Sequence, residues 1–188
     1  MYNSSIHGNA ADGTVETHGD SHILRFERHL PHPIEQVWAA ITEPEQLVAW
    51  LGEADVEPSK GGHIQLRWLN TDEHGNSAVM NATITQFEPP HLLEYAGDIH
   101  GVLRFELREE AAGCVLTFSS TLSAPNPRLS ETLAGWHVHL DFLTEALDGQ
   151  AVDWPAWPFD RWASHYKRYC QKKSEKQEEE HSSRKGSL

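Results

Sequence analysis

Histidine is the side chain best suited to chemistry that this sequence supplies in number, with thirteen copies able to bind metals or transfer protons near neutral pH. Their spacing argues against a metal centre. His29 and His32 flank Pro31, and His137 and His139 stand two residues apart, so on a helix they point to different faces. No His-Glu-x-x-His sequence and no pair of Cys-x-x-Cys motifs occurs. We therefore expect no metal site and no cofactor.

Acid–base chemistry remains open, and three side chains are conceivable acids or bases. His137 neighbours the apolar stripe of a predicted helix, from which its ring could reach a cavity, although packing at the helix edge is the simpler interpretation. Tyr95 and Asp141 are the other two candidates. Cys114 stands in no nucleophile elbow such as Gly-x-Ser-x-Gly, so we expect it to be a small buried apolar group.

Composition excludes several classes of partner. Fifteen basic and twenty-eight acidic side chains give a formal charge of −13, which repels nucleic acid and anionic lipid. The first twenty residues contain no apolar h-region and the chain has no run long enough to span a bilayer. Its two cysteines are far apart, as in a protein with reduced thiols. We expect a cytoplasmic protein that binds neither nucleic acid nor membrane.

The elements that would position these side chains begin with a strand and two short helices. Apolar and polar residues roughly alternate from Ile23 to Leu30, which predicts an opening strand. Pro33 then suits the first turn of a helix. Thr42, with Glu45 three residues later, predicts a capping box for a second short helix, which Gly52 ends.

Six further strands follow, separated by short polar or glycine-containing turns that imply antiparallel pairing. We predict them at Ala54 to Glu57, His63 to Leu69, Ala78 to Glu88, His91 to Ala96, Val102 to Arg108 and Cys114 to Leu122.

A long helix closes the domain. From Leu129 to Leu147 apolar residues recur every three or four positions, and Gly149 suits the C-cap. Beyond it we predict a stiff aromatic linker and one more helix, which could cover a cavity mouth, pack behind the sheet or mediate a dimer. We divide the chain into a disordered tail at 1–20, a domain at 21–150, the linker and helix packed on the domain at 151–172, and a disordered tail at 173–188.

Two motifs resemble a known family. The segment from Pro31 to Leu47, followed by Trp50, resembles an opening motif in which a Val-Trp pair precedes Thr-x-Pro-x-x-Leu. The segment from Gly135 to Leu143 resembles a Gly-Trp-x-x-x-Leu-x-x-Leu signature on a last helix. Both are similar to the family named after the activator of the Hsp90 ATPase, within the START and Bet v 1-like superfamily. The resemblance implies an α+β helix-grip fold, in which a curved antiparallel sheet wraps around a long C-terminal helix, with two short helices between the first two strands.

The resemblance also implies a cavity between sheet and helix that holds apolar molecules. Alternation along the strands would turn one apolar face of the sheet toward the long helix. We therefore predict a ligand site for a small hydrophobic or aromatic molecule, with a dry, filled core as the competing interpretation. Its residues would be Trp50, Trp68, Met80, Tyr95, Phe105, Phe118, Trp136, His137 and Leu140.

Two further functions stay open. One is an enzyme of the polyketide cyclase-like type acting on such a ligand. The other is a protein-interaction or chaperone-regulating module related to the Hsp90 activators, with a protein partner docking on the C-terminal extension. The sequence does not decide between a monomer and a homodimer.

Overall fold

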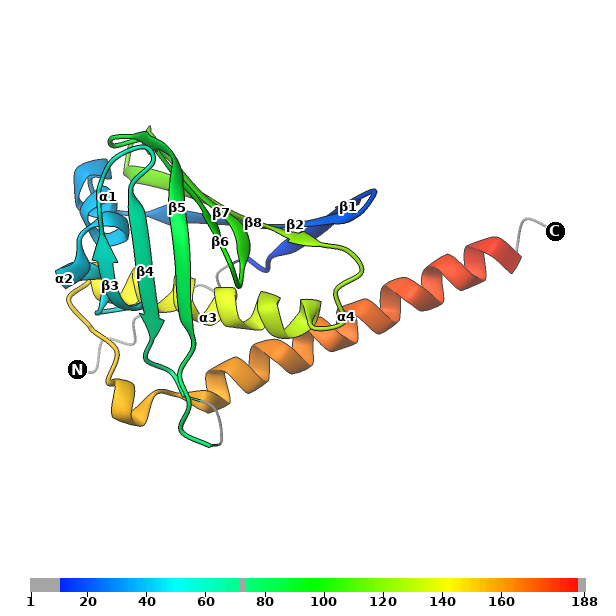
Figure 1. Cartoon of the computed structure of the whole chain (residues 1–188). Coiled ribbons are helices and arrows are strands. Elements are labelled where there is room, and N and C mark those ends of the chain that lie inside the picture. Colours follow the sequence, from blue (N-terminus) through cyan, green and yellow to red (C-terminus); the bar gives the residue numbers. More distant parts are fainter. Residues whose placement is uncertain (1–10, 72–73, 186–188) are drawn as a thin grey trace.

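Eight antiparallel strands form one curved sheet that lies against a long helix, α3 (Figure 1). The computed structural model describes residues 11–71 and 74–185. The strands are β1 (Thr14–His18), β2 (Ser21–Leu30), β3 (Gly52–Val56), β4 (His63–Trp68), β5 (Val79–Glu88), β6 (Leu92–Gly97), β7 (Gly101–Glu110) and β8 (Gly113–Ser123). The helices are α1 (Ile34–Thr42), α2 (Pro44–Leu47), α3 (Leu129–Leu147), the 3-10 turn η1 (Trp154–Ala156) and α4 (Phe159–Lys185).

The strand order places an early strand of the domain, β2, next to its last strand, β8. Across the sheet the order is β1-β2-β8-β7-β6-β5-β4-β3, so β2 lies beside β8 although most of the domain separates them in sequence. The two short helices α1 and α2 connect β2 to β3. This arrangement confirms the predicted helix-grip fold.

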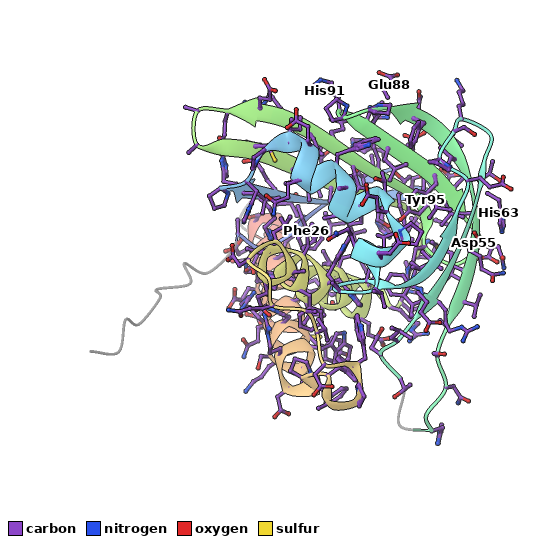
Figure 2. All side chains as sticks on the ribbon, turned by 90° about the vertical axis from the view of Figure 1, so that its left-hand side faces the viewer. Phe26, Asp55, His63, Glu88, His91 and Tyr95 are labelled. Atoms are coloured by element: carbon purple, nitrogen blue, oxygen red, sulfur yellow. The ribbon has the colours of Figure 1, made fainter. Side chains whose placement is uncertain are left out.

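Alternation along the strands sorts side chains between the interior and the solvent. In β4, Ile64, Leu66 and Trp68 are buried while the residues between them are exposed. In Figure 2 Tyr95 lies inside, between the sheet and the helices, whereas His63 lies on the outside. A two-residue period therefore places one apolar face against the helices, as the sequence predicted.

Helix α3 supplies the other half of the core. Its apolar stripe includes Leu133, Trp136, Leu140 and Leu143, all of which are buried. The helix ends where predicted, because Gly149 adopts a φ of 85° and its N–H donates to the carbonyl of Ala146. The predicted length and inward face of this helix are both found in the structure.

Both segments predicted to be tails contain secondary structure where the structure describes them. Residues 14–18 form strand β1, which pairs with β2, and the half-buried Val15 packs on the core; residues 1–10 lie outside the described residues. Helix α4 continues to Lys185 through most of the segment expected to be disordered, and residues 186–188 lie outside the description. The segment 171–185 is rich in lysine, glutamate and glutamine, whose high helix propensity favours the continuation of α4.

The predicted capping box is absent. Thr42 is the last residue of α1, and its hydroxyl donates to the carbonyl of Trp38 at 2.7 Å instead of capping α2. Helix α2 begins at Pro44, whose missing N–H needs no cap. Among the described helices, none combines the length and the apolar character needed to cross a membrane.

Candidate functional site

Most of the side chains predicted to contact a ligand fill the core. Their exposed fractions are at most 4%, and their rings pack closely, as between Phe118 and Trp136, whose centroids lie 4.4 Å apart. Six belong wholly to this packing, namely Trp50, Met80, Tyr95, Phe105, Phe118 and Leu140. Because these six side chains pack closely in the core, their role is to stabilise the fold.

The space between the sheet and the two short helices is too small for an organic ligand. Its volume is about 10 Å³, with walls that include Ile41, Leu51, Phe87 and Tyr95. Such a void holds about one water molecule. This part of the interior is therefore a filled core, which was the alternative to a ligand cavity in the sequence analysis.

A larger hollow lies at the other end of the sheet, and we call it the aromatic groove. Its volume is about 670 Å³, within the range of pockets that hold small molecules. Two predicted ligand residues line it, Trp68 at the end of β4 and Trp136 in α3. The C-terminal extension supplies the opposite wall through Trp157, Phe159 and Trp162. The connection from β4 to β5 reaches past α3 toward the start of α4 at this point (Figure 1).

Hydrogen bonds hold the extension against the domain. The N–H of Val152 donates to the carbonyl of Ala49 at 2.9 Å, and the indole N–H of Trp154 donates to the carbonyl of Val48 at 2.7 Å. The ring of Trp154 also packs edge-on against Phe142 of α3. The extension therefore packs on α3 and near α2, and its aromatic residues complete the groove.

An aromatic cluster forms the inner wall of the groove. The ring centroids of Trp68, His100 and Trp136 lie 5.2 to 5.6 Å apart in edge-to-face contacts. The indole nitrogens of both tryptophans are buried and find no hydrogen-bond acceptor among the described residues. The side-chain oxygen of Asn70, which also lines the groove, is likewise buried without a donor.

Two histidines line the groove, His100 and His139, and both are uncharged at neutral pH. Nδ1 of His139 lies 2.9 Å from the carbonyl of Trp50, so this nitrogen carries the proton and Nε2 is left as an acceptor. Burial lowers the pKa of His139 to about 4. Burial likewise lowers the pKa of His100 to about 4. The groove therefore presents aromatic surface, hydrogen-bonding groups and no imidazolium charge.

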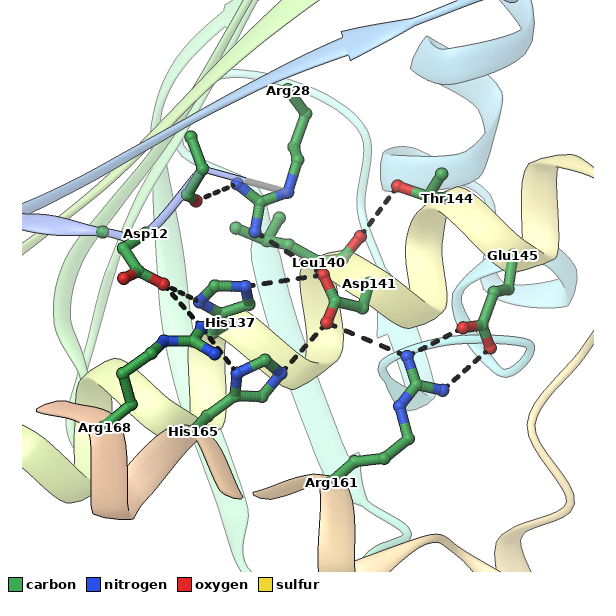
Figure 3. Close-up of polar contacts among 12 residues, drawn as sticks. Asp12, Arg28, His137, Leu140, Asp141, Thr144, Glu145, Arg161, His165 and Arg168 are labelled. Carbon is green, nitrogen blue, oxygen red and sulfur yellow. Dashed lines mark hydrogen bonds and ion pairs between the residues drawn. The ribbon is translucent and has the colours of Figure 1, made fainter. Parts of the chain in front are cut away.

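A second cluster of chemical side chains joins α3 to α4, and we call it the α3–α4 network (Figure 3). Its members are Asp12, Arg28, His137, Asp141, Arg161, His165, Arg168 and Tyr169. Among these, His137 and Tyr169 are almost completely buried, and the rings of His137 and His165 stack with centroids 3.9 Å apart.

Hydrogen-bond geometry places the protons of this network. Arg168 can only donate, so Nδ1 of His165, 3.0 Å from its guanidinium, is the acceptor. Nε2 of His165 then carries the proton and donates to Asp141 at 3.1 Å. Burial lowers the pKa of His137 to about 4, so this ring is neutral at pH 7. Burial alone would raise the pKa of Asp141, but the hydrogen bond from His165 and nearby positive charge outweigh it and hold that pKa below its usual range.

The network also resembles a metal-ligand set, which the sequence analysis missed. His137, Asp141 and His165 each offer a ligand atom, and these atoms lie within 4.8 Å of one another. A metal-bound imidazole must present an unprotonated nitrogen, whereas the bond from Arg168 keeps the proton of His165 on the nitrogen facing Asp141. The guanidinium of Arg28 already lies 3.7 Å from Asp141. The donor set therefore fits an ion-pair network and not a metal centre.

Removing the hydroxyl of Tyr169 tests how strongly this network holds α4. That oxygen accepts the N–H of Gly13 at 2.8 Å and lies 2.7 Å from Nδ1 of His137. Tyr169→Phe leaves the half-buried N–H of Gly13 and the buried Nδ1 of His137 without this partner, so we expect the free energy of unfolding to fall by about 1–3 kcal/mol in urea titrations. Tyr166→Phe on the same helix is the matched control and should change it by no more than about 0.5 kcal/mol. Equal effects of the two variants would contradict a specific role for Tyr169.

The predicted acid–base residues are not gathered in the aromatic groove. His137 and Asp141 belong to the α3–α4 network, while Tyr95 packs against Phe105 in the core. Burial raises the pKa of Tyr95 above its ordinary value, which makes it a poorer acid. His100, His139 and the side chains of the extension also line the groove, and the sequence did not predict them as site residues. For the extension, the aromatic sequence Trp-Pro-Ala-Trp-Pro at 154–158 was the available signal.

The fold and these features define a helix-grip protein with an added C-terminal helix. The family model described as activator of Hsp90 ATPase homolog 1-like protein matches residues 31–148, more than half of the chain, and the chain belongs to this family. No curated protein gives a significant match.

Solved structures agree with this assignment. A Rhodobacter sphaeroides protein is 25% identical, with a TM-score of 0.61 over 73% of this chain and 99% of its own. CalU16 from Micromonospora echinospora is 20% identical, with a TM-score of 0.62 over 85% of this chain and 93% of its own. The AHSA1-like protein from Aeromonas hydrophila is 20% identical, with a TM-score of 0.59 over 68% of this chain and 92% of its own. At 20% identity the last two show the shared fold alone.

Proposed function

We propose that this protein binds a small hydrophobic or aromatic molecule in the aromatic groove. The observation that carries the proposal is the groove itself, a hollow of about 670 Å³ whose walls combine tryptophans from the sheet, from α3 and from the C-terminal extension. Pockets of this size lined by aromatic groups and a few polar ones are the usual form of small-molecule sites. The family's fold commonly binds hydrophobic ligands, which supports the same class of function.

Exposure at the rim of the groove supports this placement. Ile99 is 45% exposed and Phe159 is 56% exposed, and both line the groove. When a ligand covers apolar side chains that contact water, the free energy of the system falls by about 25 cal/mol for each Å² of apolar surface buried. The sequence predicted a ligand site between the sheet and the long helix. On this proposal the ligand binds at the end of the sheet beside the extension, and the predicted location is part of the filled core.

Replacing a groove tryptophan should separate binding from folding. The ring of Trp162 lines the groove and stacks on Tyr166, and Trp162→Ala removes one wall at a half-buried position on the edge of the core. We expect it to weaken binding of the uncharged fluorescent probe N-phenyl-1-naphthylamine by about tenfold. Trp38→Ala is the matched control, because Trp38 packs on Phe87 away from the groove. Fluorescence titration gives both dissociation constants, and equal weakening by the two variants would remove the groove from consideration.

A further inference from the structure

The short segment 11–13, which precedes β1, uses its backbone to join the sheet to α4. The carbonyl of Ala11 accepts from the guanidinium of Arg28 in β2 at 2.9 Å. The N–H of Gly13 donates to the hydroxyl of Tyr169 in α4 at 2.8 Å. Arg28 and Tyr169 are at most 5% exposed, so the segment is anchored on buried side chains.

Gly13 brings this segment into close contact with the core. A Cβ atom at this position would lie 2.4 Å from the ring of Phe26, closer than non-bonded carbon atoms approach one another. Phe26 is 1% exposed and its ring packs on Phe118, so it has little room to move. Glycine therefore allows the segment to lie directly against the core.

The side chain of Asp12 adds two charged hydrogen bonds to α4. Its carboxylate accepts from the guanidinium of Arg168 and from the ammonium of Lys172, and Figure 3 shows the first of these contacts. Burial alone would raise the pKa of Asp12, but the hydrogen bonds from Lys172 and Arg168 hold it below its usual range. The segment therefore holds α4 by charge as well as through its backbone.

Helix α4 connects this contact to the aromatic groove. Trp162, near the start of the helix, lines the groove, and Lys172 lies about 15 Å further along the same helix at 1.5 Å per residue. Between them, His165 donates to Asp141 of α3. Because α4 is continuous from Trp162 to Lys172, contacts made by segment 11–13 restrain the position of the groove wall.

Resting on the ligand-binding function proposed above, we infer that Asp12 is a positioning residue of the aromatic groove: segment 11–13 holds α4 against the domain, and the groove binds its ligand only while α4 is held there. Asp12 does not line the groove and acts through α4. Undocking lowers the apparent affinity in proportion to the fraction of molecules that remain docked. By linkage, a ligand in the groove must in turn stabilise the docking of the segment.

Hydrogen exchange of the Gly13 amide measures this linkage in the unaltered protein, because its N–H is bonded to Tyr169 only while the segment is docked. A ligand that binds only docked molecules slows this exchange by the factor 1 + [L]/Kd. N-phenyl-1-naphthylamine at about ten times its dissociation constant should therefore slow it about tenfold. The amides of β3, the edge strand on the other side of the sheet, are the control. Equal slowing at Gly13 and in β3 would mean that the probe stabilises the whole fold, which would overturn the inference.

Charge reversal at Asp12 tests the same link by mutation. Asp12→Lys replaces attraction to Arg168 and Lys172 with repulsion, so we expect the dissociation constant of the uncharged probe to rise at least about threefold. Glu16→Lys is the matched control, because it makes the same change of charge on β1 at a side chain that is 58% exposed and pairs with His18, and it should leave the constant unchanged.

Two further variants separate positioning from general damage to the fold. Combining Asp12→Lys with Lys172→Glu restores a pair of opposite charges and should recover affinity, which a general loss of stability would not do. Gly13→Ala forces the segment away from the ring of Phe26 without changing any charge, so it should weaken probe binding in the same direction as Asp12→Lys.

The outcomes distinguish this inference from the proposed function. Failure of the unaltered protein to bind the probe would overturn the proposed function itself. Binding of the probe with no selective slowing at Gly13 would leave the groove as the site and overturn its link to the segment. Selective slowing without any effect of Asp12→Lys on affinity would overturn the role of Asp12. Selective slowing, together with recovery of affinity in the double variant, would support the inference.

Discussion

Acidification from pH 7 to pH 4.5 should lower the free energy of unfolding by on the order of 2 kcal/mol for each of His137 and His139. Both rings are buried, with exposed fractions of 1% and 4%, and burial lowers the pKa of each from 6.5 to about 4. Between those two values the unfolded chain binds a proton at each histidine and the folded chain does not. Stability is therefore complete above pH 6.5 and is lost as the pH falls toward 4.

The groups that face His137 add to the effect. Its ring stacks on His165 of α4 and lies near Arg28 of β2 and Arg168 of α4, so a proton on it meets positive charge from two elements. Asp141 of α3 and Asp12 of the N-terminal segment oppose this repulsion while they remain ionised. The pKa of each of these carboxyl groups lies below its usual range, so they lose their charge below the window in which His137 titrates.

Urea unfolding measured at half-unit steps of pH checks this prediction. His139→Asn keeps a donor for the carbonyl of Trp50 and removes the titrating group, so it should flatten the dependence on pH. His137→Asn should do the same while retaining an acceptor for the Tyr169 hydroxyl. His63→Asn, an exposed site on β4, is the control and should leave the slope unchanged. An unfolding free energy that stays constant from pH 7 to pH 4.5 would show that the two histidines are not held neutral by burial.

Phe118→Ala should destabilise the fold by about 3–5 kcal/mol, because it empties the centre of the core. Phe118 is completely buried, and its ring centroid lies 4.4 Å from that of Trp136 and 4.9 Å from that of Phe105. Chemical denaturation followed by circular dichroism measures the loss. A change below about 1 kcal/mol would mean that the surrounding rings pack less tightly than the structure indicates.

A milder variant separates this structural role from ligand contact. Phe118→Leu conserves most of the volume and should cost less than about 1.5 kcal/mol, so the protein stays folded. Because Phe118 does not line the aromatic groove, this variant should bind N-phenyl-1-naphthylamine within about twofold of the parent protein. A tenfold loss of affinity without a loss of stability would return Phe118 to the ligand site.

The elements of the domain could be predicted from hydrophobic patterns among residues that lie close together in the sequence. The two-residue period in Ile64, Leu66 and Trp68 identified the buried face of β4, and the helical period from Leu129 to Leu147 identified α3. Both patterns follow from geometry that repeats within one element, so no knowledge of the neighbouring element is needed. Strand β1 was not predicted, because this five-residue edge strand has mostly exposed side chains and no alternation of apolar and polar residues.

The candidate sites were harder to predict because their residues come from separate elements. Trp68, Trp136 and Trp162 belong to β4, α3 and α4, and only the packing of the extension on α3 brings them to one groove. Similarly, the bond from His165 to Asp141 joins two helices that the sequence analysis did not place together. The sequence marked the extension as aromatic and left open whether it covered a cavity, packed behind the sheet or formed a dimer.

By itself the sequence determined the elements of this protein, their order, their apolar faces and the family resemblance, because each depends on spacing along the chain. Tertiary structure decided which apolar side chains fill the core and which border open space. That distinction depends on how closely the sheet, α3 and the extension approach one another, and spacing in one element does not contain it. Tyr95 and Phe118 therefore became core residues, while Trp68 and Trp136 became walls of the aromatic groove.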